Sequence, residues 1–179
     1  MAGARIGILG LGAYVPERVM SNEEWAEYVD TSDEWITTRT GIKRRRLAAE
    51  DESTADLALV AGERALADAG LTPHEIDEII VASDTPEVYL PDTASFLQQR
   101  LGAREIPAYD LAGSGCAGFV LALDVARSRA REDGRRVLVI GVELLTRLMS
   151  WRDRNTCVLF GDAAGAAVIG TGTGAAEIL

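Results

Sequence analysis

Helix and strand patterns alternate along the whole sequence, and this alternation constrains the fold more than any other feature. The segments 79–82 and 137–142 are continuous apolar runs, typical of strands that are buried on both faces. Helix patterns at 54–69 and 92–101 end at Gly70 and Gly102, since glycine commonly closes helices. We therefore expect an α/β fold in which helices cover both faces of a sheet. The other elements expected are strands at 6–9, 42–47, 106–111, 156–160 and 164–169, helices beginning near 22, 33 and 73, and a long helix at 116–133.

The charge balance argues against several classes of partner. The 179 residues carry 28 acidic and 18 basic side chains, a formal net charge of −10. A field of that sign opposes binding to nucleic acid and to anionic membranes. No run approaches the roughly 18 apolar residues of a membrane-spanning helix, and the first twelve residues lack the pattern of a secretory signal. We expect a soluble, cytoplasmic protein with a core of its own.

The segment Ala117–Ala126 predicts a helix that is apolar nearly all round, with Asp124 as its only charge. Such a helix needs burial on nearly every side, so we expect another domain or subunit to cover its outer face. The end of the sequence supports this expectation, because a turn-like TGTG at 171–174 leads into new apolar residues. We accordingly divide the sequence into one unit at 1–174 and the start of a connection at 175–179.

Cys116 lies between a predicted strand and this apolar helix, among the small residues of Gly113–Gly118. Small residues permit a sharp turn and a close approach of substrate. A helix N-terminus favours a thiolate, and its free N–H groups can stabilise an oxyanion during acyl transfer. A buried cysteine that merely packs beside a tight turn is an equally good interpretation of position alone.

The other candidate groups give weaker signals. Cys157 lies in a strand-like segment and is expected to pack in the core, and two cysteines without a CxxC pair predict no metal site. His74, the only histidine, is expected in the first turn of a helix, exposed to solvent. Gly10-Leu11-Gly12 lacks the third glycine of a dinucleotide fingerprint. The basic run 43–46 is either a solvated strand face or a mouth that attracts a phosphorylated substrate.

Four blocks of the sequence together resemble β-ketoacyl-acyl-carrier-protein synthase III, the initiating condensing enzyme of bacterial fatty-acid synthesis. The blocks are Gly10–Pro16, Asp30–Ile36 with Thr38–Ile42, Gly115–Phe119, and Asp153–Thr156 followed by Phe160–Gly165. Their order and spacing agree over essentially the whole chain, except that five residues instead of four separate Asp110 from Cys116. The resemblance implies a thiolase-like αβαβα layered sandwich, of which this chain is the N-terminal βα half of a pseudo-twofold duplication.

The resemblance also implies roles for matching residues. Cys116 would accept the acyl group, and its own backbone N–H would contribute to an oxyanion hole. Trp35 and Arg154 would sandwich the adenine of coenzyme A, while Thr31 and Arg39 would contact its nucleotide end. Coenzyme A would enter as the thioester substrate, with no separate cofactor.

Three apolar positions match the acyl pocket of the family. Leu145 and Phe160 would line that pocket, and Leu90 would reach across a twofold axis into the pocket of a partner subunit. The complete enzyme would therefore be a homodimer.

The implied reaction is a decarboxylative Claisen condensation with malonyl-acyl-carrier protein. Its partners would be acyl-CoA, acyl carrier protein and the second half of the fold, because the family's catalytic histidine and asparagine belong to that half. This chain alone would hold the acyl group without completing the condensation. Two alternatives remain: a secondary-metabolism synthase III with another starter, or a non-catalytic or CoA-binding half-module that needs a partner polypeptide.

Overall fold

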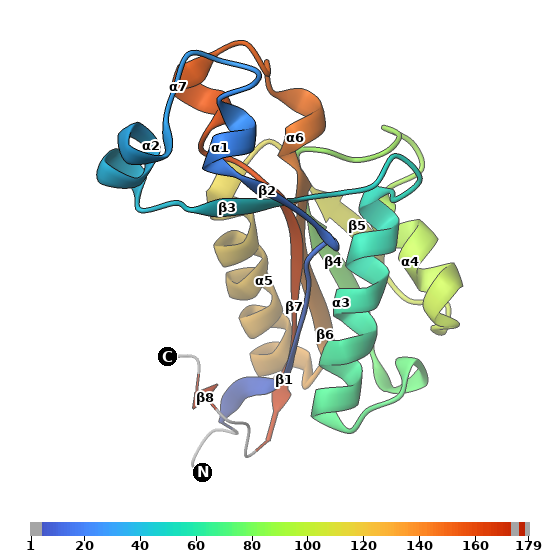
Figure 1. Cartoon of the computed structure of the whole chain (residues 1–179). Helices are drawn as coiled ribbons and strands as arrows, with labels where there is room; N and C mark the ends of the chain where they lie inside the picture. The colour runs from blue at the N-terminus through green and yellow to red at the C-terminus, as the bar shows by residue number, and fades with distance from the viewer. Residues whose placement is uncertain (1–4, 173–175, 178–179) are drawn as a thin grey trace.

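A mixed sheet of six strands forms the body of the molecule (Figure 1). The computed structural model describes residues 5–172 and 176–177. The strand order is β5-β4-β6-β7-β1-β8. In chain order these strands are β1 (Ile6–Tyr14), β4 (Glu78–Ala82), β5 (Ala108–Leu111), β6 (Val137–Leu144), β7 (Asp162–Thr171) and β8 (Ala176–Glu177). β4 pairs parallel with β5 and β6, whereas the pairs β6–β7, β7–β1 and β1–β8 are antiparallel.

Helices cover both faces of this sheet, as the alternating pattern predicts (Figure 1). α3 (Thr54–Ala69) and α4 (Thr93–Leu101) lie on one face, and α5 (Gly118–Asp133) lies on the other. Ser53 and Asp56 form a capping box at the start of α3, and Gly70 closes it in the left-handed conformation. The α/β prediction is therefore confirmed for the described residues.

Gly10 and Gly12 let β1 approach α3 closely. A Cβ atom on Gly12 would lie 2.1 Å from the carbonyl oxygen of Ala61, and one on Gly10 would lie 2.4 Å from the backbone nitrogen of Ala69. Both contacts are with backbone atoms, which cannot move aside as a flexible side chain could. The two glycines thus serve helix–strand packing, in keeping with the rejected dinucleotide motif.

A smaller subregion lies at one end of the sheet (Figure 1). A two-stranded ribbon crosses it, and four short helices gather there. The members of this subregion are β2 (Arg18–Ser21), β3 (Arg44–Leu47), α1 (Asn22–Trp25), α2 (Asp33–Thr40), α6 (Leu145–Leu148) and α7 (Arg154–Cys157). A separate apolar cluster, which includes Met20, Trp25 and Ile36, forms its core. β2 was not predicted, because four residues with exposed Arg18 and Val19 give little strand signal.

Three predicted elements differ from the structure. Residues 156–160 are not a strand, since Cys157 ends the short helix α7. The predicted helix at 73 is only a single 3₁₀ turn, η1 (Pro73–Glu75). The long helix begins at Gly118, after the 3₁₀ turn η2 (Gly115–Ala117). Local sequence patterns do not separate a single turn from a longer helix or strand, because tertiary contacts decide where such short elements stop.

The predicted all-round burial of the helix after Cys116 is absent from this chain taken alone. Ala122 and Ala126 are buried against the sheet, whereas Val120 is 65% exposed and Leu121 is 48% exposed. The boundary predicted at 174/175 lies outside the described residues; beyond it, Ala176 and Glu177 pair with β1 at the sheet edge. In the described residues no helix is both long and apolar enough to span a bilayer.

Candidate active site

Cys116 lies at the carboxyl end of the parallel strands, where open α/β sheets commonly bind ligands. It belongs to η2, two residues before the start of α5, and it is exposed. Gly113 and Gly115 precede it with φ angles of 75° and 53°. These left-handed conformations favour glycine and produce the sharp turn expected from the sequence. The thiol therefore stands at the positive end of a 16-residue helix.

A cavity of about 490 Å³ opens beside this cysteine. Its wall consists mainly of glycine and alanine from β1, β4, β6 and β7, with Phe119 and Glu143 among the larger residues. Gly141 makes room for Phe119, since a Cβ there would lie 3.0 Å from the phenyl ring. The small wall residues leave the thiol accessible in a mostly apolar space, which suits an acyl group.

Two guanidinium groups of the smaller subregion lie over the ring of Trp35. The guanidinium carbon of Arg39 lies 4.5 Å from the indole centroid, and that of Arg154 lies 4.7 Å from it. Arg154 also donates to the carbonyl of Asp30 at 2.9 Å. The structure thus brings together three residues that lie up to 119 positions apart in the sequence; their roles toward coenzyme A stay predictions.

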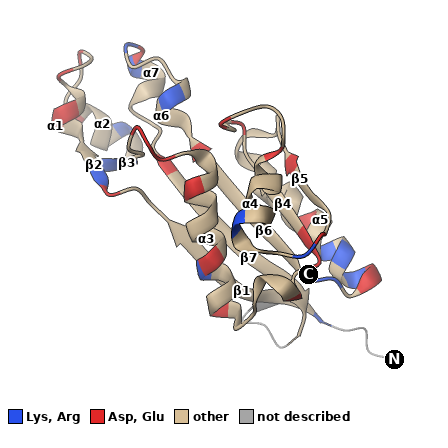
Figure 2. Ribbon diagram, turned by 90° about the vertical axis from the view of Figure 1, so that its right-hand side faces the viewer, with Lys and Arg blue, Asp and Glu red and all other residues tan. Residues whose placement is uncertain are grey.

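Caps at two helix starts position these residues. The hydroxyl of Ser32 accepts the N–H of Trp35 at 3.1 Å, and Asp153 caps α7 through the N–H of Asn155 at 3.0 Å. Hydrogen bonds from the Thr156 hydroxyl and from Asn155 hold the pKa of Asp153 below its ordinary value. Thr31 lies directly before Ser32, the N-cap of α2, and the hydroxyl oxygen of Thr31 is buried without a hydrogen-bond partner. Figure 2 shows basic residues on α6 and α7; that of α7 is Arg154 itself, and that of α6 is Arg147.

The three residues assigned to the acyl pocket do not line the cavity at Cys116. Leu145 is half-buried in α6, Phe160 is half-buried before β7, and Leu90 is 82% exposed in the loop before α4. A second cavity of about 340 Å³ near that loop is lined by Tyr89, Leu144 and others. The roles of these three residues stay predictions.

The basic run 43–46 contains both exposed and buried side chains. Lys43 and Arg44 are exposed, whereas Arg45 is only 5% exposed and donates to the Asn22 side chain and the carbonyl of Val158. Burial lowers the pKa of Arg45. Arg46 donates to the carbonyl of Pro16 at 3.0 Å. Neither a wholly solvated face nor a wholly basic mouth therefore describes the run.

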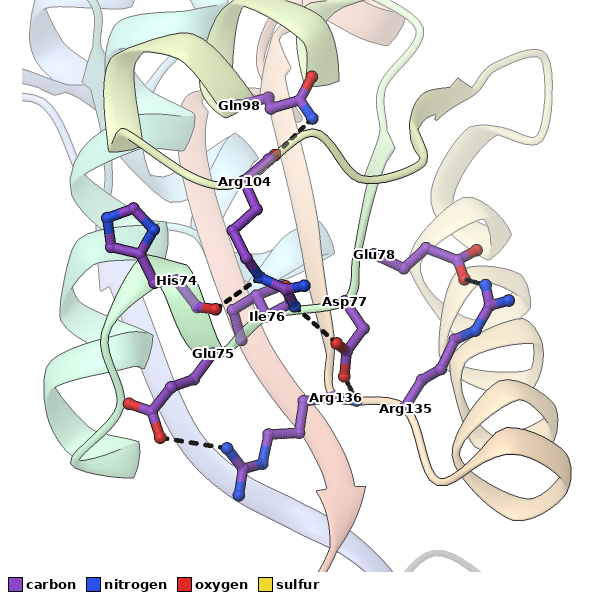
Figure 3. Close-up of polar contacts among 9 residues, drawn as sticks. All are labelled: His74, Glu75, Ile76, Asp77, Glu78, Gln98, Arg104, Arg135 and Arg136. Atoms are coloured by element: carbon purple, nitrogen blue, oxygen red, sulfur yellow. Dashed lines mark hydrogen bonds and ion pairs between the residues drawn. The ribbon is translucent and has the colours of Figure 1, made fainter.

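The two remaining candidates stand apart from the cavity. Cys157 is fully buried in the core of the smaller subregion, and burial raises the pKa of its thiol. His74 is exposed, and its backbone carbonyl accepts a hydrogen bond from the Arg104 guanidinium at 2.7 Å (Figure 3). Within the described ranges, no three His, Cys, Asp or Glu side chains form a group that could hold a metal ion.

The sequence analysis missed two carboxylates at the site. Asp84 accepts the backbone N–H groups of Gly113 and Gly115, directly before Cys116. Glu143 lines the cavity and accepts the N–H of Asp84 at 2.8 Å. The available signal was positional, because Asp84 follows the buried strand β4 and Glu143 interrupts an apolar one.

Comparisons with known proteins agree with this geometry. A family model described as 3-oxoacyl-[acyl-carrier-protein (ACP)] synthase III matches residues 109–179. A β-ketoacyl-[acyl-carrier-protein] synthase III from Caldanaerobacter subterraneus is 53% identical over 166 residues, which cover 92% of this chain and 50% of that protein. The chain spans about half the length of the curated relatives that it matches.

Solved structures give the same result. The 3-oxoacyl-[acyl-carrier-protein] synthase III from Aquifex aeolicus is 46% identical, with a TM-score of 0.90 over 96% of this chain and 55% of that one. The priming β-ketosynthase of the R1128 polyketide pathway is 39% identical, with a TM-score of 0.90 over 96% of this chain and 52% of that one. By sequence and by its thiolase-like fold, the chain belongs to the β-ketoacyl-acyl-carrier-protein synthase III family, over about half the length of its members.

Proposed function

We propose that this chain provides the acyl-accepting half of a condensing enzyme that initiates fatty-acid synthesis. The observation that carries the proposal is the exposed Cys116 thiol, which faces a small-residue cavity at the start of α5. The family names of the relatives support the same reaction class. The whole reaction would also require the second half of the fold, which would supply the histidine and asparagine, and acyl carrier protein.

In the first step, the Cys116 sulfur would attack the carbonyl carbon of an acyl-CoA thioester. A new carbon–sulfur bond would form to Cys116, the bond to the coenzyme A sulfur would break, and the thiol proton would pass to the departing coenzyme A thiolate. Backbone N–H groups at the start of α5 would stabilise the oxyanion that develops on the carbonyl oxygen in this step. Decarboxylation of malonyl-acyl-carrier protein would then yield the carbon nucleophile that takes the acyl group from Cys116.

Coenzyme A would bind through Trp35, Arg39, Arg154 and Thr31. Arg154 already covers a face of the Trp35 ring, and the adenine would need that face. Binding would therefore move the Arg154 guanidinium outward, so that it stacks on the adenine instead of on the indole. The Thr31 hydroxyl, which is buried without a hydrogen-bond partner, would have to become exposed to contact the nucleotide.

Mass spectrometry tests the role of Cys116. The chain, coexpressed with a second-half polypeptide from a relative, is incubated with acetyl-CoA, and we expect one acetyl group on Cys116. The acetyl group should be absent in Cys116→Ala and present in the matched control Cys157→Ala. Acylation that persists in Cys116→Ala, or that occurs at Cys157, would refute the proposal.

A second candidate is a synthase that primes a secondary-metabolite pathway with another starter. The likeness to the R1128 priming β-ketosynthase favours it. Acylation rates with acetyl-, isobutyryl- and hexanoyl-CoA distinguish the two, because an initiating enzyme of ordinary fatty-acid synthesis should not prefer the longest chain. Coenzyme A binding without any acylation in the same assembly would instead indicate a binding half-module.

A further inference from the structure

Two backbone N–H groups in the turn before Cys116, those of Gly113 and Gly115, point toward the same carboxylate. Gly113 and Gly115 are both left-handed, and Ser114 between them has φ −108° and ψ −2°. Alternation of this kind points successive N–H groups toward one centre, which makes a site for a negatively charged group. A Cβ atom on either glycine would meet nothing within 4 Å, so the backbone conformation and not the available space requires glycine here.

That carboxylate is the side chain of Asp84. One carboxylate oxygen accepts the N–H of Gly113, and the other accepts the N–H of Gly115 at 2.8 Å. Asp84 comes from the segment after β4, about 30 positions away in the sequence. Hydrogen bonds to an ionised carboxylate are about twice as strong as neutral ones. The pair therefore ties the glycine-rich turn to the end of a buried strand.

Asp84 is itself held from the neighbouring strand. Its backbone N–H donates to one carboxylate oxygen of Glu143 on β6 at 2.8 Å, and the Thr85 hydroxyl donates to the other oxygen at 2.6 Å. The Thr85 hydroxyl also accepts the N–H of Leu144 at 2.9 Å. A continuous set of hydrogen bonds thus runs from β6 through Asp84 to the turn that presents Cys116.

We propose that Asp84 is a positioning residue for Cys116, and this inference rests on the acyl-accepting role proposed above. Three glycines within six residues, 113–118, leave the turn a large conformational freedom that its local hydrogen bond, from Ala117 to Ser114 at 3.2 Å, does little to remove. Acyl transfer needs the thiol within a few tenths of an ångström of its attack position. The Asp84 carboxylate supplies that restraint, because it engages the turn at two points.

Asp84→Asn tests the proposal in the assembly that contains the second half of the fold. The amide keeps one acceptor oxygen but turns an NH₂ group toward the second backbone N–H. We expect the acyl-transfer rate to Cys116 to fall by about 10- to 100-fold, with the KM for acetyl-CoA within about twofold of its original value. Asp84→Glu keeps both acceptor oxygens and should recover part of the rate.

Asp77→Asn is the matched control. Asp77 lies at the opposite end of β4 and also accepts a backbone N–H, that of Arg136, at 2.9 Å. Its replacement should lower the denaturation midpoint without changing the acyl-transfer rate. An equal fall of the rate in both variants would show a general loss of stability and overturn the positioning role.

Alkylation of Cys116 by iodoacetamide across pH separates position from charge. If Asp84 acts only through its negative charge, Asp84→Asn should move the alkylation profile to lower pH and speed the reaction. The positioning role predicts that the alkylation rate falls far less than the acyl-transfer rate, since a small reagent needs no fixed thiol geometry. An alkylation rate that falls as far as the acyl-transfer rate, or a normal acyl-transfer rate in Asp84→Asn, would refute this inference alone. A wild-type assembly that takes no acyl group would refute the proposed function and this inference with it.

Discussion

The strand β4 has an aspartate near each of its ends, and the two aspartates have different hydrogen-bond partners. Asp84 follows the carboxyl end and binds only backbone N–H groups of the glycine turn before Cys116. Asp77 precedes the amino end and accepts both the N–H of Arg136 and the guanidinium of Arg104, at 2.9 and 2.7 Å (Figure 3). One end restrains a turn of small residues, whereas the other crosslinks long charged side chains.

The amino end carries a wider ionic network. Glu78 is 1% exposed, and its carboxylate contacts Arg135 at 2.8 Å and Arg129 at 3.7 Å and accepts the Tyr109 hydroxyl at 2.9 Å. Figure 3 shows Arg104 from the loop before β5, and Arg135 and Arg136 from the loop before β6, near the start of β4. We therefore expect changes at the amino end of β4 to act on stability, and changes at its carboxyl end to act on acyl transfer to Cys116.

The largest expected effect on stability is that of Glu78→Ala. The change leaves Arg129 and Arg135 without their shared carboxylate and Tyr109 without its acceptor. We expect a loss of about 2–3 kcal/mol in the free energy of unfolding, measured by urea denaturation. The acyl-transfer rate to Cys116 in the folded assembly should not change. A changed rate would show that the two ends of the sheet are coupled.

Gly113→Ala should have a smaller effect on stability and a clear effect on reactivity. The left-handed conformation costs an alanine about 1–2 kcal/mol, although its methyl group would meet no neighbour. The turn can avoid this cost by releasing Asp84, and the acyl-transfer rate should then fall as in Asp84→Asn. Gly134→Ala, at a left-handed glycine that ends α5, is the control, with a similar cost in stability and an unchanged rate.

Asp77→Asn should cost about 1 kcal/mol at neutral pH. Burial alone would raise the pKa of Asp77, but the N–H of Arg136 and the guanidinium of Arg104 outweigh burial and hold it below its ordinary value. A lowered pKa contributes stability above the unfolded-state value of about 4, and this stability is lost as pH falls through the folded value. The variant should therefore lose less stability than the wild type between pH 5 and about 3. Parallel acid titrations of the two proteins would contradict this assignment.

Tyr109→Phe should have the smallest effect at neutral pH, about 0.5–1 kcal/mol, because Glu78 keeps its arginine partners. Burial, with the hydrogen bond to Glu78, raises the pKa of Tyr109 to about 12. The folded state then holds the phenol proton more tightly than the unfolded state, whose pKa is about 10. Wild-type stability should fall as pH rises from about 10 to 12, and this part of the fall should be absent in the variant. Denaturation at pH 9, 10 and 11 checks the difference.

Much of the fold could be predicted because helix-capping residues and apolar runs mark several elements clearly in the sequence. Ser53 and Gly70 mark the two ends of α3, and the apolar runs of β4 and β6 required burial. The predicted strand over Cys157 was wrong, since an apolar run of four residues fits a strand or a buried helical turn equally well. The placement of Arg45 in the core was equally hidden, because its partners Asn22 and Val158 are distant in sequence.

The candidate site divides in the same way. Cys116 could be found from its own surroundings, since small residues before a helix are a local signal. Asp84 could not be found in this way, because its role depends on the N–H groups of Gly113 and Gly115, which lie about 30 positions away and reach it only in the folded chain. The residues Trp35, Arg39 and Arg154 were expected through the family resemblance, and the structure supplies their contacts.

The alternating elements, the glycine turn at Cys116 and the apolar helix after it follow from local sequence, because each depends on propensity and spacing between near neighbours. Which carboxylate holds the turn, which arginine is buried and which face of α5 stays exposed depend on the folded chain. Hydrogen bonds and burial join strands that lie far apart in the chain, and their energies depend on distances that no local pattern records. Asp84 and Asp77 are both aspartates next to β4, and only the groups they meet across the sheet distinguish them.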